Sequence, residues 1–248
     1  MFNFIGTTKS LFNFGCINIY WWSSVNILIF GPPGSGKSTH SRTIMEKYGL
    51  VYISSGDLIR REIERKSSLG REMEAYLSRG DLIPDTIVNT LIISKLRRQR
   101  ENFILDGYPR TPEQVISLEN YLFDHGIKLD LALEIFIDED TSVERISGRR
   151  ICPNCGAVYH VKYNPPKVPG ICDVCGSELI QRADDREEVV RKRYRIYSKN
   201  MEPIIKFYRA KGIYVRVDGD GPISEVWKRI QPLLDYIHSR EEKRKEHE

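Results

Sequence analysis

The sequence predicts an α/β protein of three layers, in which helices cover both faces of a central parallel sheet. Two observations support this fold class. Short apolar runs alternate with helical stretches along most of the chain, as in parallel-sheet proteins. In addition, the phosphate-loop (P-loop) pattern GPPGSGKS at residues 31–38 directly follows the first apolar run and precedes a helix. The 248 residues, 29 % of them charged and 40 % hydrophobic, have the composition of a globular chain with a sizeable core.

The bulk composition also limits the partners. The net charge of +4 is too small to predict nucleic-acid binding by itself. No stretch of about 18 residues stays apolar, so we expect no membrane partner. Residues 1–24 contain one lysine, no arginine and no acid, which fits neither a signal peptide nor a mitochondrial presequence. We expect a disordered or loosely docked N-terminal extension, and a cytoplasmic location by default.

The first half of the core is predicted from apolar runs that end at glycine or proline. Residues 25–30 (VNILIF) are expected to form a buried strand, residues 37–48 a helix that closes at Gly49, and residues 51–53 a second strand.

A helical segment follows. Helices are expected over residues 57–66 and 71–79, ending near Gly70 and Gly80. Pro84 is typical of a helix start, where its missing N–H costs nothing, and it precedes IVNTLIISKLRRQR.

The second half alternates in the same way. The apolar run at residues 103–105 predicts a strand that ends at Asp106, and residues 131–137 predict another, with a helix through Arg145. A loop-rich insert then carries two Cys-x-x-Cys pairs. The last expected elements are a helix over 187–210, a strand over 213–217, an amphipathic helix over 223–237 and a charged, frayed end, SREEKRKEHE.

The P-loop pattern has a direct physical reading. Its glycines let backbone N–H groups surround phosphate oxygens at a helix N-terminus. Lys37 is expected to contact the β- and γ-phosphates, and Ser38 to reach Mg²⁺. A plain glycine turn is the alternative, which the strand–loop–helix context disfavours. Asp106, at the end of FILD, is expected to hold Mg²⁺ through water, with a turn-capping aspartate as the alternative.

Six arginines lie near the predicted strand ends. Arg145 and Arg149 are four residues apart and share a helix face if the helix extends that far. Arg182 and Arg193 are eleven apart, about three helical turns. The remaining two, Arg60 and Arg110, follow glycine-containing turns.

Any one of these arginines is more often a solvated surface residue, but together they suit a reaction that develops charge on phosphoryl oxygens. No histidine–carboxylate pair accompanies them. An acceptor that is already an oxyanion, such as a nucleoside monophosphate, needs no general base.

Four of the five cysteines form two Cys-x-x-Cys-Gly units, at Cys152/Cys155 and Cys172/Cys175. This spacing predicts a tetrahedral four-thiolate site for zinc, with iron as the alternative metal. A redox dithiol would be a single pair, and disulfides are not expected without secretion signals. Cys16 is read as an unrelated free thiol.

Several segments, taken in order, resemble the adenylate kinase family in its long form with a full-size lid: GPPGSGKST, ISSGDLIR, GDLIPD, FILDGYPRTPEQ, ERISGRR, VYHVKYNPPKVPG and QRADDREEVVRKRY. The resemblance runs from about residue 25 to residue 238. It implies a P-loop core (25–53, 84–147 and 186–238), a small helical NMP-binding insert (54–83), a zinc-bound lid (148–185) and a charged tail (239–248). The zinc would be structural, stapling a flap that closes over ATP.

The resemblance also implies site residues. Those for ATP are Pro33, Gly34, Ser35, Gly36, Lys37, Ser38, Thr39, Arg145, Arg149, Val158, Tyr159 and Gly221. Those for AMP are Ser55, Arg60, Asp81, Leu82, Ile83, Gly107, Tyr108, Pro109, Arg110, Gln114, Arg182 and Arg193, with Gln114 reading the adenine edge. The catalytic set is Lys37, Arg110, Arg145, Arg182 and Arg193. The pair Asp184 and Asp185 would help to close the lid.

Two positions depart from the family pattern, since Ser55 is often threonine and Gly221 is lysine in some members. The resemblance implies reversible, Mg²⁺-dependent transfer from ATP to AMP giving two ADP. We expect a monomer. The alternatives are a GTP:AMP or UMP/CMP kinase of the same family, a zinc-ribbon nucleic-acid-binding ATPase whose basic residues include Lys162 and Lys167, and a nucleotide-binding scaffold without turnover.

Overall fold

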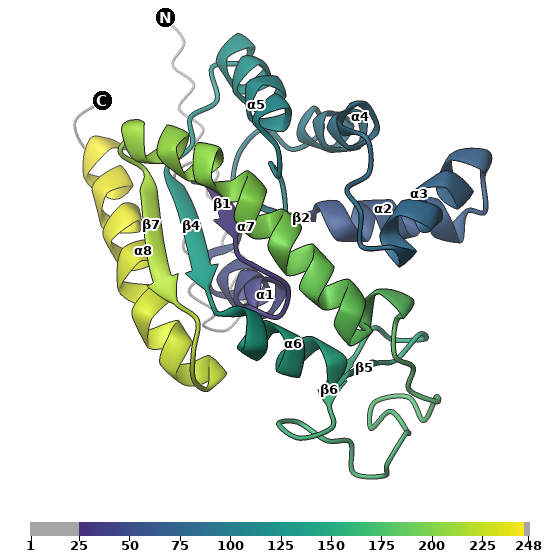
Figure 1. Ribbon diagram of the computed structural model, residues 1–248. Coiled ribbons are helices and arrows are strands. Elements are labelled where there is room, and N and C mark those ends of the chain that lie inside the picture. The colour runs from purple at the N-terminus through teal and green to yellow at the C-terminus, as the bar shows by residue number, and fades with distance from the viewer. Residues whose placement is uncertain (1–24, 246–248) are drawn as a thin grey trace, which may run out of the picture.

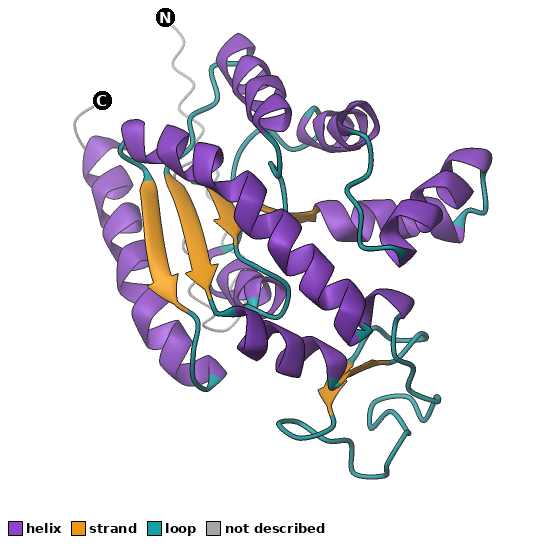
Figure 2. Cartoon of the chain, viewed as in Figure 1, coloured by secondary structure: helices purple, strands orange, loops and turns teal. Residues whose placement is uncertain are grey.

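A computed structural model describes residues 25–245, with side chains described through Arg240. The expectations for residues 1–24, including Cys16, lie outside the described residues. Five parallel strands form one sheet in the order β2-β3-β1-β4-β7 (Figures 1 and 2). These strands are β1 (Asn26–Phe30), β2 (Val51–Ser54), β3 (Phe103–Asp106), β4 (Leu131–Phe136) and β7 (Tyr214–Asp218). The predicted fold class, a three-layer P-loop architecture, is confirmed.

Helices cover both faces of the sheet (Figure 1). They are α1 (Lys37–Tyr48), α2 (Ser55–Glu64), α3 (Ser68–Ser78), α4 (Asp85–Leu96), α5 (Pro112–Asp124), α6 (Glu139–Ser147), α7 (Glu187–Ala210) and α8 (Ile223–Lys245). A short antiparallel pair, β5 (Arg149–Ile151) and β6 (Val158–His160), and a 3₁₀ turn, η1 (Ala183–Asp185), lie between α6 and α7.

Strand β1 shows why the apolar run VNILIF is continuous. Ile27 and Ile29 pack toward α1 and α8 on one face, and Leu28 and Phe30 pack toward α4, α5 and α7 on the other. Successive strand residues point to opposite faces, and helices cover both faces, so every residue of this run is buried. Burial on both faces favours an unbroken apolar run over an alternating one.

Two expectations about helices need correction. Helix α5 was not anticipated, although Pro112 occupies its first turn and the Thr111 hydroxyl accepts from the Gln114 N–H at 3.1 Å. Gly70 does not end a helix but lies in the first turn of α3. A Cβ there would lie 2.4 Å from the Glu62 carbonyl oxygen, so the glycine permits close packing of α3 on α2.

The spacing arguments for the arginines were wrong in detail. Helix α6 ends at Ser147, so Arg149 lies on β5 and not on the helix face of Arg145. Helix α7 begins at Glu187, so Arg182 precedes it rather than lying three turns before Arg193 on one helix.

The C-terminal charge run continues α8 to Lys245, as a helix end. None of the helices within residues 25–245 is both long and apolar enough to cross a bilayer.

Candidate active site

The site lies at the carboxyl edge of the parallel sheet, where β1 and β3 end side by side with Ile29 opposite Asp106. The loop between β1 and α1 turns sharply there. Gly36 has φ of 86° and caps α1, a left-handed conformation that a side chain would strain. The P-loop expected from the sequence is therefore formed at the edge where α/β proteins bind ligands.

Lys37 begins α1 and folds back over this loop. Its Nζ donates to the carbonyl oxygens of Gly31 at 2.6 Å and Pro32 at 2.9 Å, and lies 3.4 Å from the Ser35 hydroxyl. These contacts hold the ammonium group over the loop, next to the space that phosphates would enter.

The electrostatic surroundings of Lys37 are strongly positive. Burial, together with the guanidinium groups of Arg110, Arg193 and Arg149, lowers the pKa of Lys37 to about 8, although the negative charge of Asp106 acts in the opposite direction. A lysine in such a field is a strong attractor for an anion.

Asp106 lies beside the P-loop and is buried. Its Oδ2 accepts from the Ser38 hydroxyl at 3.0 Å and from the Tyr52 hydroxyl at 2.7 Å. Among the described residues, none donates a hydrogen bond to Oδ1. This set of carboxylate and hydroxyl oxygens fits the hard-oxygen preference of Mg²⁺.

Three of the six arginines, Arg60, Arg110 and Arg193, line one cleft from different elements, and Arg182 lies outside it but within the electrostatic influence of Arg60. Burial, together with repulsion from Arg60 and Arg149, lowers the pKa of Arg182 to about 10. The pKa values of Arg110 and Arg193 are also lowered, chiefly by burial and then by neighbouring arginines. Mutual repulsion among these guanidinium groups is relieved when a polyanion binds.

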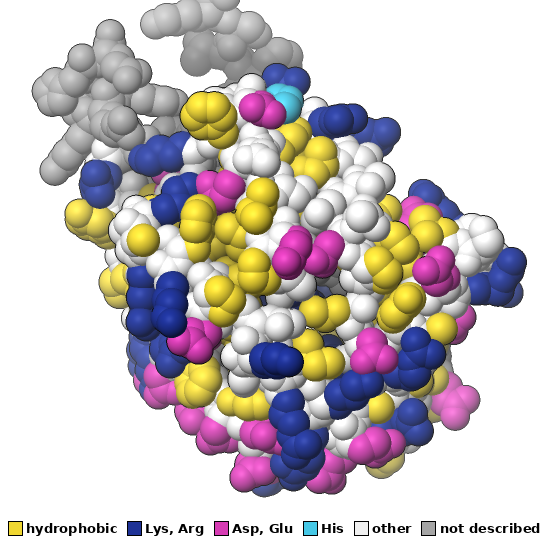
Figure 3. Space-filling view, turned by 45° about the horizontal axis from the view of Figure 1, so that its top comes forward, with side chains coloured by type: hydrophobic (Ala, Val, Ile, Leu, Met, Phe, Trp, Pro, Cys, Tyr) yellow, Lys and Arg dark blue, Asp and Glu magenta, His cyan; other side chains and the backbone are white. Residues whose placement is uncertain are grey.

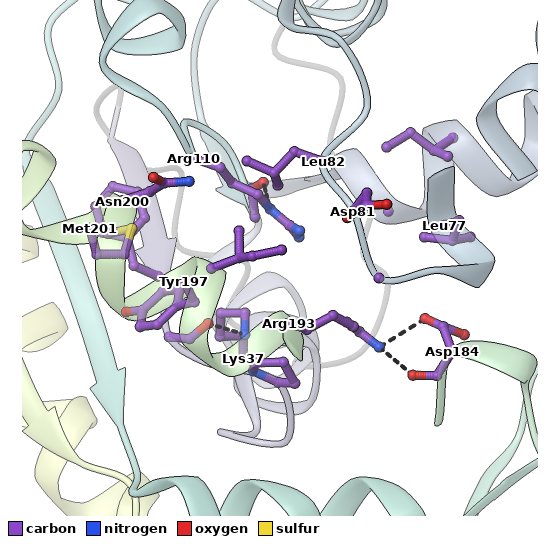
Figure 4. Close-up of a pocket in the computed structure, with 18 of the residues that line it drawn as sticks. Lys37, Leu77, Asp81, Leu82, Arg110, Asp184, Arg193, Tyr197, Asn200 and Met201 are labelled. Carbon is purple, nitrogen blue, oxygen red and sulfur yellow. Dashed lines mark hydrogen bonds and ion pairs between the residues drawn. The ribbon is translucent and has the colours of Figure 1, made fainter. Parts of the chain in front are cut away.

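Two buried aspartates orient part of this cluster. Asp185 binds the Arg149 guanidinium with both oxygens, at 3.0 and 2.5 Å. Asp184 accepts from Arg193 at 2.9 Å through both its backbone carbonyl and Oδ2, as the dashed lines of Figure 4 show. Both carboxylates come from η1, so the segment before α7 fixes the direction of these two arginines.

A cleft lies between the P-loop, the α2–α3 pair, the loop after β3 and α7 (Figure 4). It is lined by Phe30, Gly31, Pro33, Lys37, Gly56, Ile59, Arg60, Leu77, Gly80, Asp81, Leu82, Gly107, Pro109, Arg110, Asp184, Arg193, Ile196, Tyr197, Asn200 and Met201. Adjoining it is a smaller hollow, here named the acceptor hollow, lined by Ser55, Ile59, Leu77, Asp81, Leu82, Ile83, Val88, Gly107, Arg110 and Gln114.

Most residues that the resemblance assigns to AMP meet in these two spaces. Tyr108 and Arg182 are the exceptions. Arg182 lines neither space, and the side chain of Tyr108 is fully buried, with its hydroxyl donating to Asn89 Oδ1 at 2.7 Å. Asp81 also has a second role: its Oδ1 lies 2.5 Å from Lys192 Nζ on α7, which ties the end of the α2–α3 segment to that helix.

The residues expected near ATP lie in two places, namely the P-loop with Arg145 beside it, and the insert strands β5 and β6, which carry Arg149, Val158 and Tyr159. Arg145 donates to the carbonyl oxygens of Gly219 at 3.0 Å and Gly221 at 3.4 Å in the loop after β7, and to the Gly34 carbonyl of the P-loop at 3.5 Å. It therefore bridges these two loops. Tyr159 points the other way. It is buried, and its hydroxyl accepts from the Asp173 N–H at 2.8 Å, so its side chain supports the insert rather than facing a nucleotide.

The four cysteines of the insert come together. Their sulfur atoms all lie within 4.8 Å of one another, with Cys152–Cys175 at 3.4 Å and Cys155–Cys172 at 3.5 Å. A disulfide would need about 2.05 Å, and all four are free thiols. Four sulfurs bound to one zinc at about 2.3 Å would lie about 3.8 Å apart, so the donor set fits that metal.

Three contributors to the site were missed from the sequence. Tyr52 binds Asp106, Tyr197 lines the cleft, and the Ser142 hydroxyl donates to the Pro33 carbonyl at 2.6 Å. No local pattern marks them, since each acts across a large sequence separation. Asp85, which binds Gln114, could have been found from the sequence, because it directly follows Pro84 at the expected start of a helix.

The face in Figure 3 bears on the nucleic-acid alternative. Acidic side chains lie among the basic ones over this face, so it presents no extended surface of one sign. Nucleic-acid-binding proteins usually carry a continuous basic patch or stripe.

Comparisons with known proteins agree with the geometry. The family described as adenylate kinase matches residues 29–213. A protein named adenylate kinase from Thermococcus gammatolerans is 89 % identical over 224 residues, covering 90 % of this chain and all of the relative. Proteins of the same name from Pyrococcus abyssi and Archaeoglobus fulgidus are 74 % and 44 % identical, covering 89 % and 87 % of this chain and all of each relative.

Proposed function

Because this chain belongs to the adenylate kinase family, we propose that it transfers the γ-phosphoryl group of ATP to AMP, reversibly giving two ADP. It is a nucleoside monophosphate kinase. The observation that carries the choice of reaction is the convergence of Lys37, Arg110 and Arg193 on one cleft between the P-loop and the acceptor hollow. Such a cleft suits phosphate groups that arrive from both sides.

The proposed mechanism depends on positioning and charge. Lys37 and the P-loop would hold the donor phosphates, and Arg110 would hold the acceptor phosphate. Arg182 and Arg193 would bind the oxygens of the group in transfer, where planar guanidinium groups match the geometry. The attacking phosphate oxygen is already ionised, so the reaction needs orientation rather than a base.

The cleft's own side chains are consistent with this mechanism. Among the described residues that line it, there is no histidine, and the two carboxylates, Asp81 and Asp184, are both bonded to cationic side chains. Neither carboxylate is therefore poised to accept a proton from a substrate.

Two metals belong to the proposal. Mg²⁺, bound with ATP, would neutralise phosphate charge, and Asp106 with Ser38 would hold its waters. Zinc on the four cysteines would stabilise the insert structurally, because four thiolates leave no open coordination position.

We propose the domain division implied by the resemblance. Residues 54–83 would form the acceptor insert, residues 148–185 the lid, residues 25–53, 84–147 and 186–238 the P-loop core, and the residues after 238 the charged tail. We also propose that the enzyme acts as a monomer, which light scattering of the purified protein tests directly.

The test is a nucleotide panel. Purified protein with Mg²⁺ is given each common NTP paired with each common NMP, and diphosphate formation is followed. Diphosphate made at highest kcat/KM from ATP with AMP supports the proposal, and a preference for GTP, UMP or CMP selects the corresponding relative. Hydrolysis of ATP that is unaffected by AMP overturns it and favours the nucleic-acid-dependent ATPase, which steep salt-dependent binding to RNA or DNA would then identify.

A matched pair of variants on α7 separates charge in the cleft from charge in general. Arg193→Ala removes a guanidinium that faces the cleft, and we expect kcat to fall by about 10²–10⁴-fold. Arg195→Ala removes a guanidinium that is 74 % exposed two residues away, and should leave kcat within twofold. Equal losses in both variants would contradict the assigned role of Arg193.

A further inference from the structure

The side chain of Gln114 is held by two partners in the acceptor hollow. Gln114 lies in the first turn of α5 and is 2 % exposed. Its Oε1 accepts from the backbone N–H of Arg110 at 2.7 Å, and its Nε2 donates to Asp85 Oδ1 at 2.6 Å.

These two contacts fix which end of the amide is oxygen. A backbone N–H can only donate, so the atom facing Arg110 must be the acceptor. An ionised carboxylate can only accept, so the atom facing Asp85 must carry hydrogen. A flip of the Gln114 amide would therefore break both bonds at once, in a site where buried polar groups are costly to leave unpaired.

Asp85 is itself held in place. Its Oδ2 accepts from the Thr111 hydroxyl at 2.7 Å, and the same hydroxyl accepts from the Gln114 backbone N–H at 3.1 Å. Asp85, Thr111 and Gln114 thus form a closed ring of hydrogen bonds between the start of α4 and the start of α5.

The fixed amide has one hydrogen and one lone pair left to offer. An amide NH₂ has two donors and its oxygen two lone pairs. Among the described residues, only Arg110 and Asp85 hydrogen-bond to the side chain of Gln114. The remaining pair is a donor on Nε2 and an acceptor on Oε1, in a fixed order along the wall of the hollow.

This order distinguishes purines. A 6-aminopurine presents an acceptor at N1 and a donor at N6, whereas a 6-oxopurine presents a donor at N1 and an acceptor at O6. The two edges are the same shape with donor and acceptor exchanged, so only an amide that cannot flip tells them apart.

We propose that Asp85 is a positioning residue that sets base specificity: it locks the Gln114 amide in the orientation that accepts 6-aminopurine monophosphates and rejects 6-oxopurine monophosphates. The inference rests on the proposed function, in which Gln114 reads the acceptor base. It adds that Asp85 makes base recognition by Gln114 selective for 6-aminopurines.

The experiment compares AMP with inosine monophosphate, a 6-oxopurine without the extra 2-amino group of guanine. The quantity measured is the ratio of kcat/KM for AMP to kcat/KM for inosine monophosphate, with ATP and Mg²⁺ saturating. The variants are Asp85→Asn, whose amide can either donate or accept, and Asp85→Ala, which offers neither. Glu139→Gln is the control, because Glu139 is likewise the first residue of a helix but lies at α6.

We expect both Asp85 variants to lower this ratio about tenfold, since the flip then breaks one bond instead of two. A merely structural role would slow both substrates equally and leave the ratio unchanged, as expected for Glu139→Gln. Two Asp85 variants keep the test decisive should one of them fail to fold.

A Gln114→Ala variant separates the inference from its premise. If Gln114→Ala lowers the ratio while both Asp85 variants keep it within twofold, the inference is overturned and base reading by Gln114 stands. If Gln114→Ala leaves the ratio unchanged, or the parent enzyme does not use AMP, the premise itself is overturned and the inference with it.

Discussion

Raising the pH from 7 to 9 is expected to weaken ATP binding about tenfold, because Lys37 loses its charge in this range. Burial and neighbouring arginines lower the pKa of Lys37 to about 8 in the free protein. Bound phosphates place negative charge beside the ammonium group and raise this pKa again. The pKa of Lys37 is thus higher in the complex than in the free protein, so the affinity is nearly full at pH 7 and is lost as the pH rises through 8.

The size of the effect follows from the fraction of free protein that carries the proton. With a pKa of about 8, Lys37 is roughly 90 % protonated at pH 7, about half protonated at pH 8 and roughly 10 % protonated at pH 9. Binding should therefore take up about 0.5 proton at pH 8 and about 0.9 at pH 9. The ratio of the protonated fractions at pH 7 and pH 9 gives the tenfold change in affinity.

Isothermal titration calorimetry measures both quantities. Titrations of Mg-ATP at pH 7, 8 and 9, each in two buffers of different ionisation enthalpy, give the affinity and the number of protons exchanged. Lys37→Met should lose the proton uptake. Lys47→Met, which removes a lysine from the last turn of the same helix, should keep it. An affinity that is constant from pH 7 to 9, or proton uptake that survives in Lys37→Met, would refute the reasoning.

Three further predictions concern the two proposed metal sites and a buried carboxylate of the sheet. Cys155→Ser should reduce bound zinc well below one ion per chain, measured by mass spectrometry of the metal, and should lower the melting temperature; full zinc occupancy would argue against the four-thiolate site. Tyr52→Phe removes the 2.7 Å bond to Asp106 and should raise the Mg²⁺ concentration for half-maximal rate several-fold, with the rate recovered at high Mg²⁺; an unchanged requirement means that Tyr52 does not orient Asp106. Glu134→Ala leaves two tyrosine hydroxyls and one guanidinium without their buried acceptor, and should cost about 3 kcal/mol in urea unfolding; a loss below about 1 kcal/mol would contradict this.

The features that the sequence predicts best are those encoded within a few residues. The P-loop and each Cys-x-x-Cys unit place their ligand-binding groups within a few residues of one another. The alternation of apolar runs with helical stretches indicates a parallel sheet. Long-range pairs are different: the bonds of Arg149 to Asp185 and of Asp85 to Gln114 depend on where separate elements meet. Helical spacing could not find them, because Arg149 and Asp185 are not on a common helix.

The two inserts are stabilised in different ways, and this bears on how each can move. Ile59 of α2 and Met73 of α3 belong to the main hydrophobic core, so the acceptor insert shares its packing with the sheet. The lid has a separate small core built around Cys152, Tyr159 and Cys172.

A core this small does not hold a segment of nearly forty residues together, so the proposed zinc would supply stability that packing cannot. The contacts that attach the lid to α6 are polar: Lys162 pairs with the Glu144 carboxylate at 2.6 Å, and His160 lies 3.2 Å from the Glu144 carbonyl oxygen. Polar contacts of this kind are easily exchanged for water, whereas an apolar interface is not. The proposed zinc inside the segment and the polar contacts outside it would therefore allow the proposed lid to open without unfolding.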